Sequence, residues 1–233
     1  TGAEGQAYGY KDSWSSLDDY LEFMEERVRE IHRVLKDTGS FYLHCDWHAN
    51  HYLKVMCDRI FGYGNFRNEI VWCYRGGGVP KDSFAKKHDT ILRYSKTKDF
   101  TFNQQYVPYS EASQKLVKSK GGVSIDGKKR DLERGATMPD WWADFNSLQT
   151  WSPERVGFPT QKPLTLLERI IKASSNEGDI VLDCFMGSGT TCVAAAKLNR
   201  RYIGIDLSPV AVRLVEARIK EYRIIFTICE NFI

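Results

Sequence analysis

The residues best suited to hold a small-molecule ligand lie between positions 181 and 206. A predicted buried strand ends at Asp183, and a turn containing Gly187 and Gly189 follows before a helix begins. The next predicted strand ends at Asp206. In a parallel sheet both acids reach the carboxyl edge, where ligands bind. Two acids beside a glycine turn favour adenosine with an amino-acid tail, held at its ribose by Asp206. The alternative is a structural Asp206 that caps the following helix.

Other glycine-rich ligand loops fit this turn poorly. A dinucleotide fingerprint requires Gly-x-Gly-x-x-Gly, but Cys192 occupies the position of the third glycine. A phosphate-binding loop requires Gly-Lys-Thr or Gly-Lys-Ser, and the turn reads Gly-Ser-Gly-Thr-Thr. The turn therefore indicates a different adenosine ligand from a dinucleotide or a nucleoside triphosphate.

The middle of the chain combines basic and aromatic residues. Basic side chains suit phosphates and aromatic rings suit bases, so this pattern favours a nucleic-acid face, with a lysine-rich solvated surface as the alternative. The basic residues are Lys81, Lys86, Lys87, Arg93, Lys96, Lys98, Lys115, Lys118, Lys120, Lys128, Lys129, Arg130 and Arg134. They alternate with Phe84, Tyr94, Phe100, Phe102, Tyr106 and Tyr109.

The whole composition is that of a globular protein. The chain has 233 residues, 42% of them hydrophobic and 13% aromatic, with a formal charge of +3. No run approaches the ~20 apolar residues of a membrane span, and the polar start at Thr1 does not resemble a signal peptide. Six cysteines without a Cys-x-x-Cys pair predict reduced thiols. We expect a cytoplasmic protein with no membrane partner.

The elements that must position these residues alternate between strands and helices. Apolar spacing predicts helices at about 15–37, 49–61, 164–174, 190–198 and 209–221, and strands at about 40–44, 69–74, 90–95, 179–183 and 202–206. This order predicts an α/β fold with one doubly wound, mostly parallel sheet. Periodicity weakens in the middle, which indicates an insertion. The expected divisions are 1–75, 76–151 for the insertion, and 152–233.

Two motifs in the last third resemble a known family. The stretch from Asp183 to Thr191 resembles the Asp-Pro-Phe-x-Gly-Ser-Gly-Thr motif of S-adenosylmethionine-dependent DNA amino-methyltransferases, with Cys184 in place of proline. The Thr-Gln-Lys-Pro sequence that begins at Thr160 is similar to the segment that precedes this motif in the permuted, beta-class order. The resemblance implies a Rossmann-like methyltransferase fold, with the insertion as the target-recognition segment.

The front half is similar to the same family over residues 14–46, 52–72, 88–96 and 139–142. The resemblance implies S-adenosyl-L-methionine as cofactor and double-stranded DNA as partner, in a prokaryotic or phage setting. It is compatible with a restriction endonuclease partner and with a homodimer. The implied cofactor-binding residues are Thr160, Gln161, Lys162, Pro163, Asp183, Phe185, Gly187, Ser188, Gly189, Thr190 and Asp206. The DNA-binding residues expected are Lys86, Lys87, His88 and Arg93.

The family's catalytic tetrapeptide, Asp/Asn/Ser-Pro-Pro-Tyr/Phe, does not occur in the sequence. In the family this motif accepts hydrogen bonds from the amine of a flipped base and stacks on its ring. In the family this motif comes just before a segment that residues 1–14 resemble, so we expect the chain to begin after the motif. We therefore assign no catalytic residue in this sequence. The chain alone is therefore expected not to methylate DNA, whereas its full-length parent does.

The leading interpretation is an adenine-N6 methyltransferase. The alternatives are an N4-cytosine enzyme, a non-catalytic DNA- or cofactor-binding remnant, and an RNA or small-molecule methyltransferase. An upstream Asp-Pro-Pro motif would favour adenine, and Ser-Pro-Pro-Tyr would favour cytosine.

A metal site is the remaining alternative. His44, His48 and His51 lie near Cys45 and Asp46, and these are residue types that bind zinc. Methyl transfer from a sulfonium requires no metal, and the family resemblance already accounts for this segment. We therefore expect none.

Overall fold

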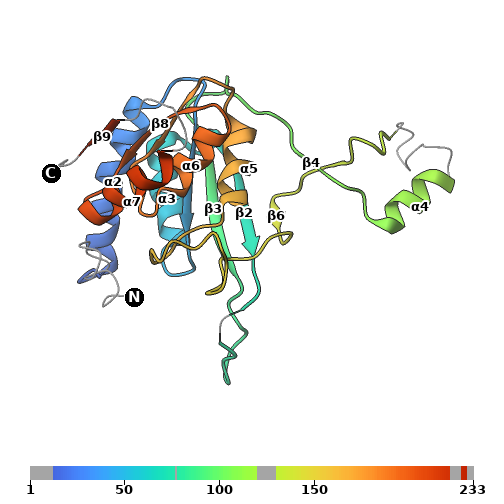
Figure 1. The fold of residues 1–233 in the computed structure, drawn as a ribbon, viewed down its shortest axis with the longest axis horizontal. Coiled ribbons are helices and arrows are strands. Elements are labelled where there is room, and N and C mark those ends of the chain that lie inside the picture. The colour runs from blue at the N-terminus through green and yellow to red at the C-terminus, as the bar shows by residue number, and fades with distance from the viewer. Residues whose placement is uncertain (1–12, 77, 120–129, 221–226, 230–233) are drawn as a thin grey trace.

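A computed structural model describes residues 13–76, 78–119, 130–220 and 227–229 (Figure 1). Its helices are α2 (Leu17–Val34), α3 (Asn50–Phe61), α4 (Glu111–Ser119), α5 (Leu164–Ser174), α6 (Thr190–Lys197) and α7 (Pro209–Ile219), with a 3-10 turn at Tyr63–Asn65. Its strands are β1 (Ser40–Cys45), β2 (Phe66–Cys73), β3 (His88–Ser95), β4 (Tyr106–Val107), β5 (Ala136–Thr137), β6 (Trp141–Trp142), β7 (Ile180–Asp183), β8 (Arg201–Ile205) and β9 (Thr227–Cys229). No helix within these ranges is long and apolar enough to span a membrane.

The last third forms a parallel unit, as its sequence predicts. Strands β7, β8 and β9 lie side by side in that order, and all pair in parallel. Helix α6 connects β7 to β8, and Cys192 and Val193 of that helix belong to the same buried cluster as Tyr202 of β8. Parallel strands require such a crossover. Asp183 and Asp206 therefore follow strands that end at one edge.

The front sheet differs from the mostly parallel sheet that we expected, although the α/β fold class is confirmed. Its order is β1-β3-β2-β6, and β3 is antiparallel to both β1 and β2; only β2 and β6 pair in parallel. The physical reason is the connection from β2 to β3, whose described residues, 74–76 and 78–87, form no helix. A strand without a crossover helix returns antiparallel. As a result, the carboxyl ends of β1 and β2 flank the amino end of β3.

Helix α5 packs against both sheets. Leu166 is 2% exposed and lies in a cluster with Ile70, Trp72 and Ile91 of the front sheet. Five residues further, on another face of the helix, Ile171 is buried with the cluster of α6 and α7. Tyr42 of β1 also shares a hydrogen bond of 2.6 Å with Ser174 at the end of the helix. This helix fixes the position of the parallel unit relative to the front sheet.

Helices α2 and α3 cover the front sheet. Met24 and Val28 of α2 pack with Leu53 and Cys57 of α3 in one buried cluster. Helix α2 ends three residues earlier than predicted, at Val34. Its start is capped by Ser16, whose hydroxyl accepts the amide of Asp19 at 3.0 Å. Cys45, Cys57, Cys73, Cys184 and Cys192 are free thiols.

The middle segment forms an arm. Strands β4 and β5 pair with each other, and they connect the body to helix α4, which lies well away from the two sheets (Figure 1). Residues 120–129, which include Lys120, Lys128 and Lys129, lie outside the described residues. The arm is therefore a projection from the body.

The start of α6 depends on a glycine. Gly189 is the N-cap, with φ of +72°, a left-handed conformation that disfavours any side chain. A Cβ atom placed there would lie 2.3 Å from Cγ2 of Val215 on α7. The turn can therefore approach α7 closely only because residue 189 lacks a side chain.

We predict that Gly189→Ala lowers the free energy of unfolding by more than the strain of about 1–2 kcal/mol for a left-handed residue, because overpacking adds about 1–3 kcal/mol. Gly178→Ala is the matched control, since Gly178 has φ of +81° and no atom within 4 Å of the added methyl. Urea unfolding of both variants measures the difference. Equal destabilisation by the two substitutions would show that contact with Val215 is unimportant.

Candidate cofactor and acceptor site

Asp206 braces the glycine turn. Its Oδ2 accepts the amide of Gly187 at 2.8 Å, and its Oδ1 accepts the amide of Ser208 at 2.8 Å. Both bonds fix the carboxylate, and each oxygen keeps a further lone pair that can accept from a ligand. The sequence left two roles open for Asp206, contact with a ligand and support of the local structure. This geometry is compatible with both.

Asp183 occupies the neighbouring strand end. Its Oδ1 accepts the amide of Phe185 at 3.0 Å. Burial raises the pKa of Asp183, and the nearby charge of Asp206 acts in the same direction, while the bonds from Thr191 and Phe185 oppose it. The two carboxyl groups lie at adjacent strand ends, and their oxygens can accept hydrogen bonds. Such a pair suits a ligand that carries hydroxyl or amino donors.

The rest of the predicted turn is closely packed. Ser188 and Thr190 are buried, and their hydroxyl oxygens lie 3.0 Å apart. Arg218 of α7 donates to the carbonyl of Ser188. Phe185, in contrast, is 50% exposed, and its ring lies 6.4 Å from that of Phe23 on α2. The hydroxyls of Ser188 and Thr190 therefore shape the turn, and Phe185 is the side chain of the turn that is open to a ligand.

The segment before α5 borders the same turn. A Cβ atom at Gly187 would lie 3.1 Å from the ring of Phe158, which is itself buried. Thr160 has φ of +59°, an uncommon value for a residue with a side chain. Gln161 holds the segment in place, since it accepts the amide of Val156 at 2.9 Å and donates to the carbonyl of Glu154 at 2.8 Å. The structure thus brings the two sequence motifs together.

Lys162 and Pro163 complete this segment. Lys162 donates to the carbonyl of Thr160 at 2.9 Å, and Pro163 is the N-cap of α5. Burial lowers the pKa of Lys162, while the charge of Asp89 opposes that effect. Asp89 comes from β3 in the front sheet, so this lysine lies where the two halves of the molecule meet.

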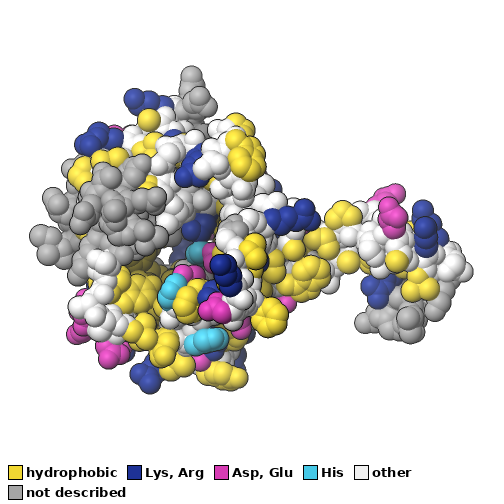
Figure 2. All heavy atoms as spheres, turned by 90° about the horizontal axis from the view of Figure 1, so that it is seen from below, with side chains coloured by type: hydrophobic (Ala, Val, Ile, Leu, Met, Phe, Trp, Pro, Cys, Tyr) yellow, Lys and Arg dark blue, Asp and Glu magenta, His cyan; other side chains and the backbone are white. Residues whose placement is uncertain are grey.

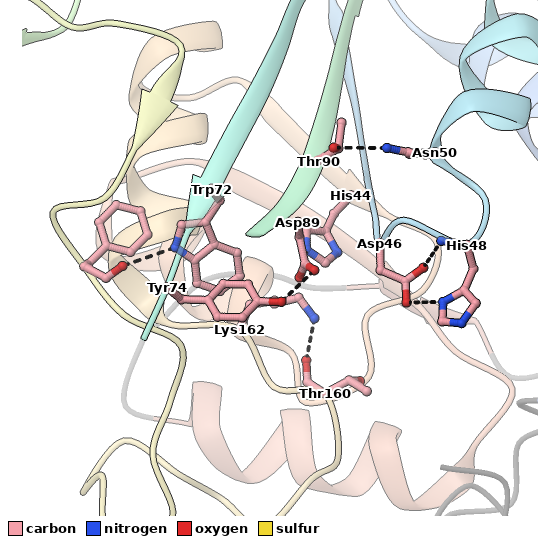
Figure 3. A network of polar contacts seen from close by, with 11 residues as sticks. His44, Asp46, His48, Asn50, Trp72, Tyr74, Asp89, Thr90, Thr160 and Lys162 are labelled. Carbon is pink, nitrogen blue, oxygen red and sulfur yellow. Dashed lines mark hydrogen bonds and ion pairs between the residues drawn. The ribbon is translucent and has the colours of Figure 1, made fainter. Parts of the chain in front are cut away.

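A polar network that sequence reasoning missed surrounds Asp89 (Figure 3). Asp89 accepts the hydroxyl of Tyr74 at 2.9 Å through Oδ1, and its Oδ2 lies 2.9 Å from Nε2 of His44. The three residues come from the adjoining ends of β1, β2 and β3. The histidine and the acid were each visible in the sequence, but only the strand register places them together.

The expected DNA-facing residues separate into two groups. Lys86 is exposed on the connection between β2 and β3, and His88 is exposed at the first position of β3. Lys87 donates to the carbonyls of Gly76 and Gly78. Arg93 is a correction: it is 3% exposed, and its guanidinium lies 4.3 Å from the ring centre of Phe102. It points into the molecule because it lies on the central strand β3. Arg93 is therefore not available to a phosphate.

The side of the molecule seen in Figure 2 is hollowed, and charged and histidine side chains gather around its middle.

Within the described residues, no group of three or more histidine, cysteine, aspartate or glutamate side chains could hold a metal ion. His48 instead pairs with Asp46, with Nδ1 2.8 Å from Oδ2.

The chain is similar to known proteins over most of its length. The family model described as DNA methylase (N6_N4_Mtase) matches residues 3–217. The Type II methyltransferase M.HpaI of Haemophilus parainfluenzae is 35% identical over 216 residues, which are 92% of this chain and 64% of that protein. The DNA adenine methyltransferase YhdJ of Escherichia coli (strain K12) is 33% identical over 213 residues, 88% of this chain and 68% of that protein.

A solved structure supports the fold assignment. The M1.HpyAVI complex with S-adenosylmethionine has a TM-score of 0.60 at 21% identity, over 87% of this chain and 84% of that one. On the family match, this chain belongs to the N6/N4 DNA methylase family.

Proposed function

We propose that the protein transfers the methyl group of S-adenosylmethionine to the N6 amine of adenine in double-stranded DNA. The observation that carries this proposal is the glycine turn between Asp183 and Asp206, with the segment from Phe158 to Pro163 against it. Membership of the DNA methylase family supports the reaction. The similarity to YhdJ, a DNA adenine methyltransferase, supports adenine as the target, and N4-cytosine is the second candidate.

The residues of the turn fit this cofactor. When bound, S-adenosylmethionine supplies an electrophilic methyl group on a sulfonium centre. Asp206 is held by two backbone amides and is oriented to accept from ribose hydroxyls. Asp183 offers a second hydrogen-bond acceptor beside it, and the segment from Thr160 to Pro163 closes the methionine side. Methyl transfer requires the amine and the methyl group in line, so positioning by these residues is a large part of catalysis.

DNA lies, in this proposal, against the edge formed by the connection of β2 and β3. Lys86 and His88 are exposed there, and Lys86 Nζ lies 4.4 Å from the ring centre of Trp47, which is 51% exposed. The arm projects from the body and carries further basic residues, including Lys115 and Lys118 on α4. Basic groups on two separate projections can contact the backbone at two places along a duplex.

We also propose a restriction-modification setting in a prokaryotic or phage-infected cytoplasm. A restriction endonuclease as companion and a homodimer as the working form belong to the same proposal. The bacterial source of the relatives supports the setting. Mass spectrometry of hydrolysed DNA would distinguish the two target bases, since the product is either N6-methyladenine or N4-methylcytosine.

We predict that Asp206→Asn weakens binding of S-adenosylmethionine by at least about tenfold, since it removes a charge-assisted contact and loosens the bond to Gly187. Isothermal calorimetry measures the dissociation constant. Asp179→Asn is the matched control, because Asp179 precedes β7 at the opposite end of the strand and accepts the amide of Asn176 at 2.8 Å. Equal affinities of wild type and Asp206→Asn would remove Asp206 from the cofactor site.

We predict that the double variant Lys86→Glu, Lys87→Glu weakens binding to DNA of any sequence to a similar extent. If both lysines contact phosphate, the slope of log affinity against log salt becomes shallower by roughly 0.9 for each. The control is Lys36→Glu with Lys98→Glu, which makes the same charge change with exposed residues at the opposite edge of the front sheet. Fluorescence anisotropy at several salt concentrations measures both. An equal loss in the control would indicate net charge rather than local contact.

A further inference from the structure

A cavity of about 310 Å³ lies between the front sheet and the segment that precedes α5. Trp72, Tyr74 and Asp89 line it from the sheet side, and Phe158 and Lys162 line it from the other. Phe158 also borders the glycine turn, since a Cβ atom at Gly187 would lie 3.1 Å from its ring. The cavity is therefore adjacent to the proposed cofactor site, with one aromatic ring in common.

The aromatic wall of this cavity is held by hydrogen bonds. Nε1 of Trp72 donates to the carbonyl of Phe145 at 3.2 Å, and the hydroxyl of Tyr74 donates to Asp89 at 2.9 Å. The two rings meet edge to face with centres 5.3 Å apart. Burial, together with the bond to Asp89, raises the pKa of Tyr74 to about 12, so the phenol stays a donor. The orientation of Tyr74 thus depends on Asp89.

Asp89 is an ionised carboxylate. Burial opposes its ionisation, but the bonds from His44 and Tyr74 and the charge of Lys162 outweigh burial and hold the pKa of Asp89 below its usual value. Burial lowers the pKa of His44, so the imidazole is neutral. Because the carboxylate only accepts, Nε2 of His44 carries the proton. Asp46 is the other acid whose charge acts on His44 and Tyr74.

We propose that Asp89 is a positioning residue for the acceptor base. It holds Tyr74 in one orientation at the cavity wall, so that a flat base entering the cavity stacks in one way beside the glycine turn. Without the bond to Asp89, the hydroxyl of Tyr74 would require another hydrogen-bond partner, and the ring could rotate. This inference rests on the proposed function, because the base is the acceptor of that reaction.

The test compares Asp89→Asn with Asp58→Asn in the full-length protein. Asp58 is a matched control in the core: it accepts the hydroxyl of Tyr94 at 2.7 Å and Nζ of Lys54 at 2.7 Å. The side chains of Asp58 and Asp89 are similarly exposed, at 22% and 16%. Both substitutions remove a carboxylate that binds a tyrosine, but only Asp89 borders the cavity.

The measurements are kcat, KM for DNA, and the dissociation constant for S-adenosylmethionine. We expect Asp89→Asn to lower kcat by at least about tenfold, and to change the other two constants by less than about threefold. Cofactor affinity is preserved because Lys162 keeps its bond to the Thr160 carbonyl. Asp58→Asn should lower the unfolding temperature and leave all three constants within about threefold.

A second variant, Tyr74→Phe, removes only the hydroxyl and keeps the ring. It should also lower kcat, by a smaller factor than Asp89→Asn does. A kcat of Asp89→Asn within about threefold of wild type would overturn the inference, as would an equal loss in Asp58→Asn. A wild-type protein that binds S-adenosylmethionine and methylates DNA keeps the proposed function whatever the variants show. A wild-type protein that does neither would overturn that function, and the inference with it.

Discussion

The burial of two faces of α5 is the constraint on which the rest of the structure depends. Leu166 packs against the front sheet and Ile171 against the parallel unit, so one helix connects two sheets. Apolar area removed from water stabilises by roughly 25 cal/mol per Å². Helix α5 starts directly after Pro163, and its position therefore also sets that of the segment from Phe158 to Lys162. Because α5 is buried against both sheets, the segment before it lies between them, and the site forms there.

The same arrangement explains why the site has two unlike sides. The parallel unit presents strand ends and a glycine turn, a backbone surface that can approach a ligand closely. The front sheet presents side chains instead, because its antiparallel β3 places Asp89 between the ends of β1 and β2. One side suits the cofactor proposed above, and the other suits a flat acceptor. Phe158 borders both the glycine turn and the cavity beside the front sheet.

Carboxylates in this protein illustrate how context decides their role. Asp206 accepts two backbone amides and so braces the turn that it borders. Asp89 bonds to His44 of β1 and to Tyr74, which follows β2. Asp58 bonds to Tyr94 of β3 and to Lys54 of its own helix. The three groups share one chemistry and nearly the same degree of bonding. The three carboxyl groups differ in what they border: the glycine turn for Asp206, the cavity for Asp89, and the core for Asp58.

The sequence by itself determined α5, β7, α6, β8 and α7, because helix caps, glycine turns and crossover helices are local features. The family resemblance implied that the Thr160 motif and the glycine turn belong to one site. The tertiary structure decided the rest. Strand register, set by burial of one face, brought His44, Tyr74 and Asp89 together and placed Arg93 in the interior. A pattern of alternating elements did not reveal the antiparallel front sheet, since strand direction depends on what connects β2 to β3. Asp89 bonds to Tyr74, which is 15 positions away in the sequence, and to His44, which is 45 positions away. Such contacts depend on the register of the strands and cannot be predicted from any single segment.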